Sequence, residues 1–272
     1  MAQRDGSASV LGPRRIVFGA HRDLSGAIDA QLDGTRFEAS HCDLGGAGLS
    51  AFDAVVPLKL SHYRDLAARA DEGRALAVVP DADVAELCED KLALNQALIA
   101  KGFADHVPPV RGPGPPYPYV WKRRRGYWGR HARVVRSAAD EGQRDDADWF
   151  GQTLVPGDVE YGSNILRADG RIWYAATTRY ELARPDGVLG AFERPVRLLY
   201  QRGCEHLRLF AGILAALGYE GTACIDYKIV GGVPQIFEIN PRFGASLVYD
   251  LNAYLDAYLN VLGGRSGADR AP

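Results

Sequence analysis

Short apolar runs alternate with polar segments of helical composition over the first hundred residues of the chain. The run Arg15 to Ala20 (RIVFGA) fits a buried parallel strand. Further strands are predicted at residues 37–42 (FEASHC), 52–58 (FDAVVPL) and 75–80 (ALAVVP). Alternating strands and helices predict a small parallel α/β domain over residues 13–104, after a polar tail over 1–12.

The pattern changes in the second half of the chain. Residues 81–103 predict one or two helices, and the segment 106–119 is too rich in proline and glycine for a helix. Three strands are predicted over 149–181, with an Ala-Asp-Gly turn between the last two. Helices are predicted over 195–218, where Gly218 ends the pattern, and over 245–262.

Polar residues interrupt two strands predicted on either side of a Gly-Gly turn. Side chains alternate along a strand, so Glu238 and Asn240 share a face, as do Asp226 and Lys228 on the partner strand. A three-residue connection, 231–233, would place Asp226 directly opposite Glu238. A connection of two or four residues would put them on opposite faces.

In the first register, two carboxylates and an amide oxygen converge, which suits Mg²⁺ because this cation takes oxygen ligands. Arg242 follows the second strand and can place a forked cation beside a bound anion. The alternative is a hairpin with a solvated polar face. We favour the metal site, because opposed carboxylates destabilise a sheet unless something neutralises them.

The residues of this hairpin resemble the ATP-grasp superfamily, of the carboxylate-amine ligase type. In that family an acid on one strand and a Glu-x-Asn pair on the next hold two magnesium ions of ATP, and an arginine often follows. The resemblance implies Asp226, Glu238 and Asn240 as metal ligands and Arg242 as a catalytic residue. It implies ATP and two Mg²⁺ ions as cofactors, with Mn²⁺ as a substitute.

The resemblance also implies a fold and its divisions. The class is α/β, an α+β ATP-grasp fold preceded by a small parallel α/β (pre-ATP-grasp) domain over 13–104. The small lobe with its glycine loop then covers 105–155 and the large lobe with the metal hairpin covers 156–262. Residues 263–272 have the small, polar composition of a disordered tail.

Three further motifs occur in the order that the family shows. Asp90-Lys91 matches a helix start whose lysine reaches the nucleotide phosphates. Lys122 matches the strand lysine that contacts the α- or β-phosphate. The following loop, with Gly126 and Gly129, matches the glycine loop that closes over the β- and γ-phosphates, because glycines let backbone N–H groups approach an anion.

That loop is unusually cationic and aromatic for the family. It could grip phosphate with side chains or contact an anionic substrate. A basic nucleic-acid patch is the rival interpretation, which the rest of the chain does not support by its composition. The side chains concerned are Arg123, Arg124, Arg125, Tyr127, Trp128, Arg130 and His131.

The segment QTLVPGDVEY resembles the hinge between the two lobes, where backbone groups pair with adenine and an acid binds the ribose hydroxyls. The resemblance implies adenine contacts from Thr153 to Val155 and ribose contacts from Glu160. Gln152 takes the place of the glutamate that often begins the hinge, and it retains an acceptor.

Weaker candidates lie outside these motifs. Arg179 is predicted to contact phosphate or acyl phosphate, with a surface ion pair to Glu181 or Asp186 as the alternative. Ligands bind open α/β sheets at the carboxyl ends of the strands. His21, Arg22, Lys59 and His62 lie at such predicted ends.

Composition excludes several classes of protein. The net charge of −2 gives no reason to expect nucleic acid or membrane as a partner. The absence of a run of about 20 apolar residues and of a signal-peptide core predicts a cytoplasmic protein. Four scattered cysteines argue against a zinc site. The turn GAHRDLSGA lacks the GxGxxG pattern of NAD-dependent enzymes.

The implied reaction is ATP-dependent ligation of a small-molecule carboxylate to an amine through an acyl phosphate, with release of ADP and phosphate. No protein nucleophile is required. The alternatives are a kinase or carboxylase component of the same fold and a non-catalytic ATP-binding subunit. A homodimer is the default expectation for the assembly.

Overall fold

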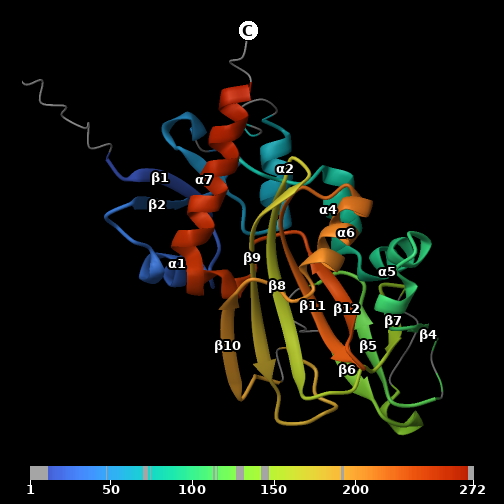
Figure 1. The fold of residues 1–272 in the computed structure, drawn as a ribbon. Coiled ribbons are helices and arrows are strands. Elements are labelled where there is room, and N and C mark those ends of the chain that lie inside the picture. Colours follow the sequence, from blue (N-terminus) through green and yellow to red (C-terminus); the bar gives the residue numbers. More distant parts are fainter. Residues whose placement is uncertain are drawn as a thin grey trace, which may run out of the picture.

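Three β-sheets organise the residues that the computed structural model describes, which are 12–46, 48–69, 73, 75–112, 114, 116–126, 132–141, 147–190 and 193–268. An N-terminal sheet has the strand order β2-β1-β3, a second sheet β4-β7-β5-β6, and a third β10-β9-β8-β11-β12. The five-stranded sheet lies between the other two (Figure 1). Strands in the N-terminal sheet are parallel, and those of the other two are antiparallel.

The N-terminal sheet confirms the predicted parallel α/β pattern. It contains β1 (Arg14–Gly19), β2 (Phe37–Cys42) and β3 (Ala54–Val56), with helices α1 (Ser25–Gln31) and α2 (Leu60–Ala67). The strand predicted at 75–80 is wrong. The Val78 N–H donates to the Tyr258 hydroxyl at 2.7 Å instead of to a strand, and Pro80 has no N–H to donate.

Helices α4 (Ala82–Glu89) and α5 (Lys91–Ala100) are separated at Asp90, whose side chain caps α5 by accepting from the Ala93 N–H at 3.2 Å. Leu94 and Leu98 belong to the core that β11, β12 and α6 (Leu207–Leu217) build. Helix α5 therefore packs with the five-stranded sheet, whereas α4 contacts both that core, through Cys88, and α2, through Ala85.

The C-terminal helix α7 (Leu251–Ala268) completes the core of the N-terminal sheet, where Tyr254 and Leu255 pack with Ile16 and Phe18. It covers that sheet in Figure 1. The tail predicted from residue 263 is in fact helical as far as Ala268. None of the described helices has the length and apolar character needed to cross a bilayer.

The small-lobe sheet presents two different faces. It contains β4 (Val110–Arg111), β5 (Tyr119–Arg123), β6 (Ala132–Val135) and β7 (Trp149–Thr153). Tyr119 and Trp121 pack with Val135 on one face. Alternation along β5 puts Val120 and Lys122 on the other face.

The central sheet contains β8 (Val159–Ala168), β9 (Arg171–Glu181), β10 (Arg197–Arg202), β11 (Gly221–Val230) and β12 (Val233–Asn240). The predicted turn between β8 and β9 is confirmed, with positive φ at Asp169 and Gly170. The first half of the helix predicted over 195–218 is wrong, because these residues pair with β9 as an edge strand. Short 3₁₀ helices occur at η1 (Leu49–Ala51), η2 (Ala104–His106), η3 (Ala138–Asp140) and η4 (Ala245–Asp250).

Gly19 allows the close packing of α2 on the end of β1. A Cβ at this position would lie 2.0 Å from Nδ1 of His62, which is buried. We predict that Gly19→Ala lowers the free energy of unfolding by about 2 kcal/mol, because the imidazole must move within a packed site. Urea denaturation measures the change.

Gly26→Ala is the matched control, since Gly26 lies in α1 and a Cβ added there would meet no atom within 4 Å. We expect it to be neutral or slightly stabilising, because alanine favours a helix. Equal destabilisation by the two substitutions would contradict the packing account of Gly19.

Candidate active site

The β11–β12 hairpin brings Asp226 directly opposite Glu238, and Cys224 opposite Asn240. The connection is not the predicted three residues, because Val230 pairs with Val233 and only Gly231 and Gly232 form the turn. A β-bulge restores the predicted pairing. Tyr227 pairs with Ile236 while Asp226 pairs with Glu238, so Phe237 is the extra residue.

The two carboxylates are bridged by one amide. Asn240 Nδ2 donates to Asp226 Oδ2 at 2.9 Å and to Glu238 Oε1 at 3.0 Å. The amide oxygen accepts from Arg242 Nη1 at 2.6 Å. Burial raises the pKa of Asp226 well above its usual range, and the charge of Glu238 is the second cause of this rise.

This donor set fits a hard divalent cation. The described residues contain no group of three or more His, Cys, Asp or Glu side chains that could hold a metal. The two carboxylates suffice for Mg²⁺, which is bound by one or two carboxylates together with substrate phosphates. Asn240 turns its Nδ2 toward them in this structure, so its oxygen would reach a cation only after the amide rotates. Burial raises the pKa of Asp226, and a cation bound at the pair would favour its ionised form.

Lys91 joins the β11–β12 hairpin to the segment that follows β5. It is the first residue of α5, and its Nζ lies 3.1 Å from Glu238 Oε2 and donates to the Gly126 carbonyl at 2.9 Å. Burial opposes ionisation of Glu238, but the charges of Lys91 and Lys122 outweigh it and lower its pKa to about 2. Gly129 lies outside the described residues.

Lys122 and Glu160 lie in the same buried region. Lys122 Nζ donates to the Phe237 carbonyl at 3.3 Å. Burial lowers the pKa of Lys122 to about 8, against the opposing charge of Glu238. Burial also raises the pKa of Glu160 to about 7, while the charge of Lys228 acts in the other direction. The predicted phosphate lysine and ribose acid therefore lie in one cluster of charged side chains with the acidic pair.

Two of the arginines after β5 form ion pairs with acidic residues of α4 and of the α5 N-cap. Arg124 binds Asp90 through Nε at 3.1 Å and Nη2 at 2.6 Å. Arg125 lies 3.4 Å from a carboxylate oxygen of Glu86. These pairs anchor the start of the glycine loop to α4 and α5, a role that the sequence analysis did not predict. Tyr127, Trp128, Arg130 and His131 lie outside the described residues.

The hinge begins later than predicted. The Thr153 N–H donates to the Pro109 carbonyl at 2.9 Å, and its hydroxyl accepts from Arg111. Gln152 Nε2 donates to the Pro108 carbonyl at 3.0 Å. Both residues belong to β7, so the Thr153 N–H is already bound, and the adenine contacts expected from Thr153 to Val155 stay a prediction for their other backbone groups. Val155 is the predicted hinge residue whose carbonyl faces the large lobe, where Lys228 lies 3.4 Å away.

Arg179 lies on the wrong face of the central sheet for its predicted role. Arg179, on β9, pairs with Tyr161 of the neighbouring strand β8. Asp226, on β11, pairs with Gly162, which is the next residue of β8. Successive side chains point to opposite faces of a sheet. Arg179 forms an ion pair with Glu181, which is the alternative that the sequence analysis named.

A cavity of about 340 Å³ opens at the carboxyl ends of the N-terminal strands. His62 is only 1% exposed there, and its Nδ1 accepts from the Leu58 N–H at 3.1 Å. The other nitrogen, Nε2, therefore carries the proton, and it has no hydrogen-bond partner among the described residues. The lining residues are Ala20, Asp43, Lys59, Ser61, His62 and Asp65.

Of the other candidates at this edge, His21 lies close to Lys59 and Arg242. Burial, opposed by Asp23, lowers the pKa of His21, and the charges of Lys59 and Arg242 add to the effect. This edge of the N-terminal sheet thus lies near Arg242, which follows β12. Arg22 is exposed and does not line the cavity.

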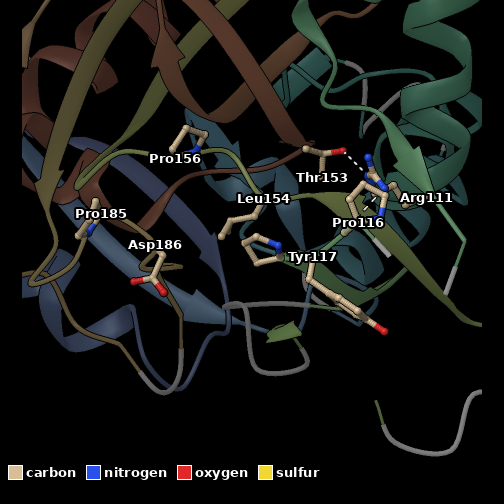
Figure 2. Close-up of a pocket in the computed structure, with 9 residues that line it drawn as sticks. Arg111, Pro116, Tyr117, Thr153, Leu154, Pro156, Pro185 and Asp186 are labelled. Carbon is tan, nitrogen blue, oxygen red and sulfur yellow. Dashed lines mark hydrogen bonds between the residues drawn. The ribbon is translucent and has the colours of Figure 1, made fainter. Parts of the chain in front are cut away.

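A second cavity, of about 440 Å³, lies on the outer side of the hinge (Figure 2). Thr153 lines this cavity. Because Thr153 pairs with Tyr119, the cavity lies on the face of the β4-β7-β5-β6 sheet opposite to Lys122. Most of the lining is apolar, with Arg111 and Asp186 as its charged members. The remaining residues are Pro116, Tyr117, Pro118, Leu154, Pro156 and Pro185.

Sequence reasoning missed several residues that shape these sites. Asp43 directly follows the strand predicted at 37–42, so the strand-end rule that identified His21 could have found it. Gly162 gave no signal, although a Cβ there would lie 3.1 Å from Asp226 Oδ1. Lys228 was placed on the face of Asp226 but was given no function.

No protein-family model matches the chain, and no curated protein matches it by sequence. Solved structures do. D-alanine–D-alanine ligase from Bacillus anthracis superposes with a TM-score of 0.63 at 13% identity, covering 94% of this chain and 99% of its own. A biotin carboxylase–β,γ-ATP complex from Campylobacter jejuni gives a TM-score of 0.61 at 14% identity, covering 92% and 70%.

N5-carboxyaminoimidazole ribonucleotide synthetase from Thermotoga maritima gives a TM-score of 0.59 at 14% identity, covering 92% of this chain and 75% of that one. These enzymes are ATP-grasp proteins. Their shared architecture extends over nearly the whole chain, including the parallel N-terminal sheet and the antiparallel sheets around the acidic hairpin. The chain therefore has the ATP-grasp fold.

Proposed function

We propose that this protein is an ATP-dependent carboxylate-amine ligase that works through an acyl phosphate. The observation that carries the proposal is the cluster around the opposed carboxylates, where Lys91 and Lys122 converge on Glu238. A cluster of two partly buried acids and two lysines suits a metal-bound polyphosphate, because each anion has a cation to neutralise it.

Each side chain has a separate task in this proposal. Asp226, Glu238 and Asn240 would hold Mg²⁺, which supplies charge neutralisation on the phosphate oxygens. Lys91 and Lys122 bind the phosphates, and Arg242 stabilises charge that develops at the transferred group. Lys91 already contacts the Gly126 carbonyl, so the lysine orders the start of the glycine loop.

The chemistry proceeds in two displacements. A carboxylate oxygen attacks the γ-phosphorus, the bond to the β-phosphate oxygen breaks, and ADP leaves. The amine nitrogen then attacks the acyl carbon, phosphate leaves, and the nitrogen loses a proton as the C–N bond forms. Positioning and charge neutralisation carry both steps.

The 340 Å³ cavity at the N-terminal strand ends is the proposed site of the small-molecule substrates. It is lined by carboxylates, a lysine and His62, whose buried Nε2–H no described residue accepts. A buried donor without a partner costs free energy, so a ligand acceptor at this point is favourable. The cavity is small and polar, which suits a compact charged molecule.

The proposal is tested by incubating the protein with Mg-ATP, hydroxylamine and pools of amino acids and other carboxylic acids. Hydroxylamine intercepts an acyl phosphate as a hydroxamate whatever the natural amine is. We expect hydroxamate and ADP in equal amounts for one acid. Formation of AMP and pyrophosphate would reject the acyl phosphate, and ADP formed with bicarbonate alone would instead indicate a carboxylase component.

Glu238→Gln removes one charge from the acidic pair and keeps the side-chain volume. We predict that ATP turnover falls by about 100-fold, equivalent to roughly 3 kcal/mol of lost charge stabilisation. Glu205→Gln, at an exposed position, is the control and should retain full turnover. Wild-type turnover in Glu238→Gln, measured as ADP release, would reject the metal assignment.

His62→Ala removes this donor from the substrate cavity. We predict a KM for the small substrate about tenfold higher, because one buried hydrogen bond is worth roughly 1.5 kcal/mol. The KM for ATP should stay within twofold, since the cavity is separate from the acidic hairpin. A raised KM for ATP with an unchanged KM for the small substrate would contradict this assignment.

A further inference from the structure

Lys228 is a buried lysine that binds carbonyl oxygens instead of a carboxylate. The residue is 2% exposed. Its Nζ donates to the carbonyls of Gly157 at 2.8 Å, Gly187 at 2.8 Å and Val155 at 3.4 Å. A buried ammonium is costly unless its protons are bound, and an apolar residue of similar size would usually be at least as stable. The position of this cation therefore calls for a functional explanation.

The three carbonyls come from two separate segments. Val155 and Gly157 belong to the hinge, and Gly187 belongs to residues 182–190 after β9, here called the strap. The same segments are joined twice more, since the Gly157 N–H donates to the Pro185 carbonyl at 2.7 Å and the Leu182 N–H to the Asp158 carbonyl at 2.6 Å. Lys228 thus fastens the strap to the hinge from the large-lobe side.

The strap also contacts the predicted ribose acid and the small lobe. The Leu189 N–H donates to Glu160 Oε2 at 3.4 Å. Arg136, directly after β6, donates through Nε to Asp186 Oδ2 at 3.1 Å. A change in the strap would therefore reach Glu160, although no described contact joins Lys228 to that carboxylate directly.

We propose that Lys228 is a positioning residue that holds the hinge and the strap together so that Glu160 faces the ribose hydroxyls of the nucleotide. This inference rests on the nucleotide site proposed above. It adds a specific property, which is that selection of a ribonucleotide over a 2′-deoxyribonucleotide depends on Lys228. The lysine does not touch the ribose; it acts through the backbone that it holds and through its charge, which favours ionised Glu160.

The test is calorimetric titration of wild type and Lys228→Met with Mg-ADP and with Mg-2′-deoxy-ADP. We expect wild type to bind ADP about tenfold more tightly than the deoxy form, the value of one hydrogen bond to a charged group. In Lys228→Met, ADP affinity should fall at least tenfold and the preference for the 2′-hydroxyl should fall below twofold. Lys228→Arg, which keeps the donors, should restore most of that preference.

Two further variants separate positioning from stability. Gln235→Met replaces the residue that pairs with Lys228 across the hairpin, and it should leave both affinities unchanged. Gly157→Ala strains a backbone at φ 121° whose carbonyl Lys228 binds, so it should also abolish the 2′-hydroxyl preference. Gly170→Ala, at φ 74° in the β8–β9 turn, controls for strain alone and should keep the preference.

The outcomes distinguish the two claims. If wild type binds neither nucleotide, the proposed function is rejected together with the inference. If wild type discriminates and Lys228→Met or Gly157→Ala discriminates equally well, the inference is rejected and the proposed function stands. A lower melting temperature with unchanged discrimination also rejects it, because the lysine would then serve stability only.

Discussion

Two half-buried carboxylates placed directly opposite each other constrain the rest of this molecule. Asp226 and Glu238 are direct neighbours across an antiparallel strand pair, an arrangement that destabilises a sheet unless cations are near. The fold supplies those cations from other elements, Lys91 from the start of α5 and Lys122 from β5. Through these two lysines, β5 and the start of α5 contact the acidic hairpin of the central sheet.

The parts of this site that could be predicted are those with a local signal. Alternation along β11 and β12 identified the acidic face, and the resemblance to ATP-grasp motifs implied Lys91 and Lys122. The register itself could not be derived, because a two-residue turn and a bulge at Phe237 compensate each other. A one-residue change in either would have moved Glu238 to the other face.

Errors in the fold prediction have a common cause. The secondary structure of a short apolar segment depends on hydrogen-bond partners that are distant in the sequence. The segment at 75–80 has a strand-like sequence, but its Val78 N–H is bound by Tyr258, 180 residues away. The β10 residues have the sequence pattern of a helix, but they form a strand because they pair with β9. The proline carbonyls of Pro108 and Pro109 likewise bind the Gln152 side-chain amide and the Thr153 N–H, partners that no local pattern in the hinge segment indicates.

The central claim is that the acidic hairpin holds a divalent cation together with a nucleotide polyphosphate. The most direct test is calorimetric titration with a non-hydrolysable ATP analogue in the presence of Mg²⁺ and in its absence with EDTA. The account predicts binding that weakens by at least about tenfold without Mg²⁺, since the opposed carboxylates would then repel the phosphates. Equal affinity under both conditions, or no binding in Mg²⁺, would contradict it.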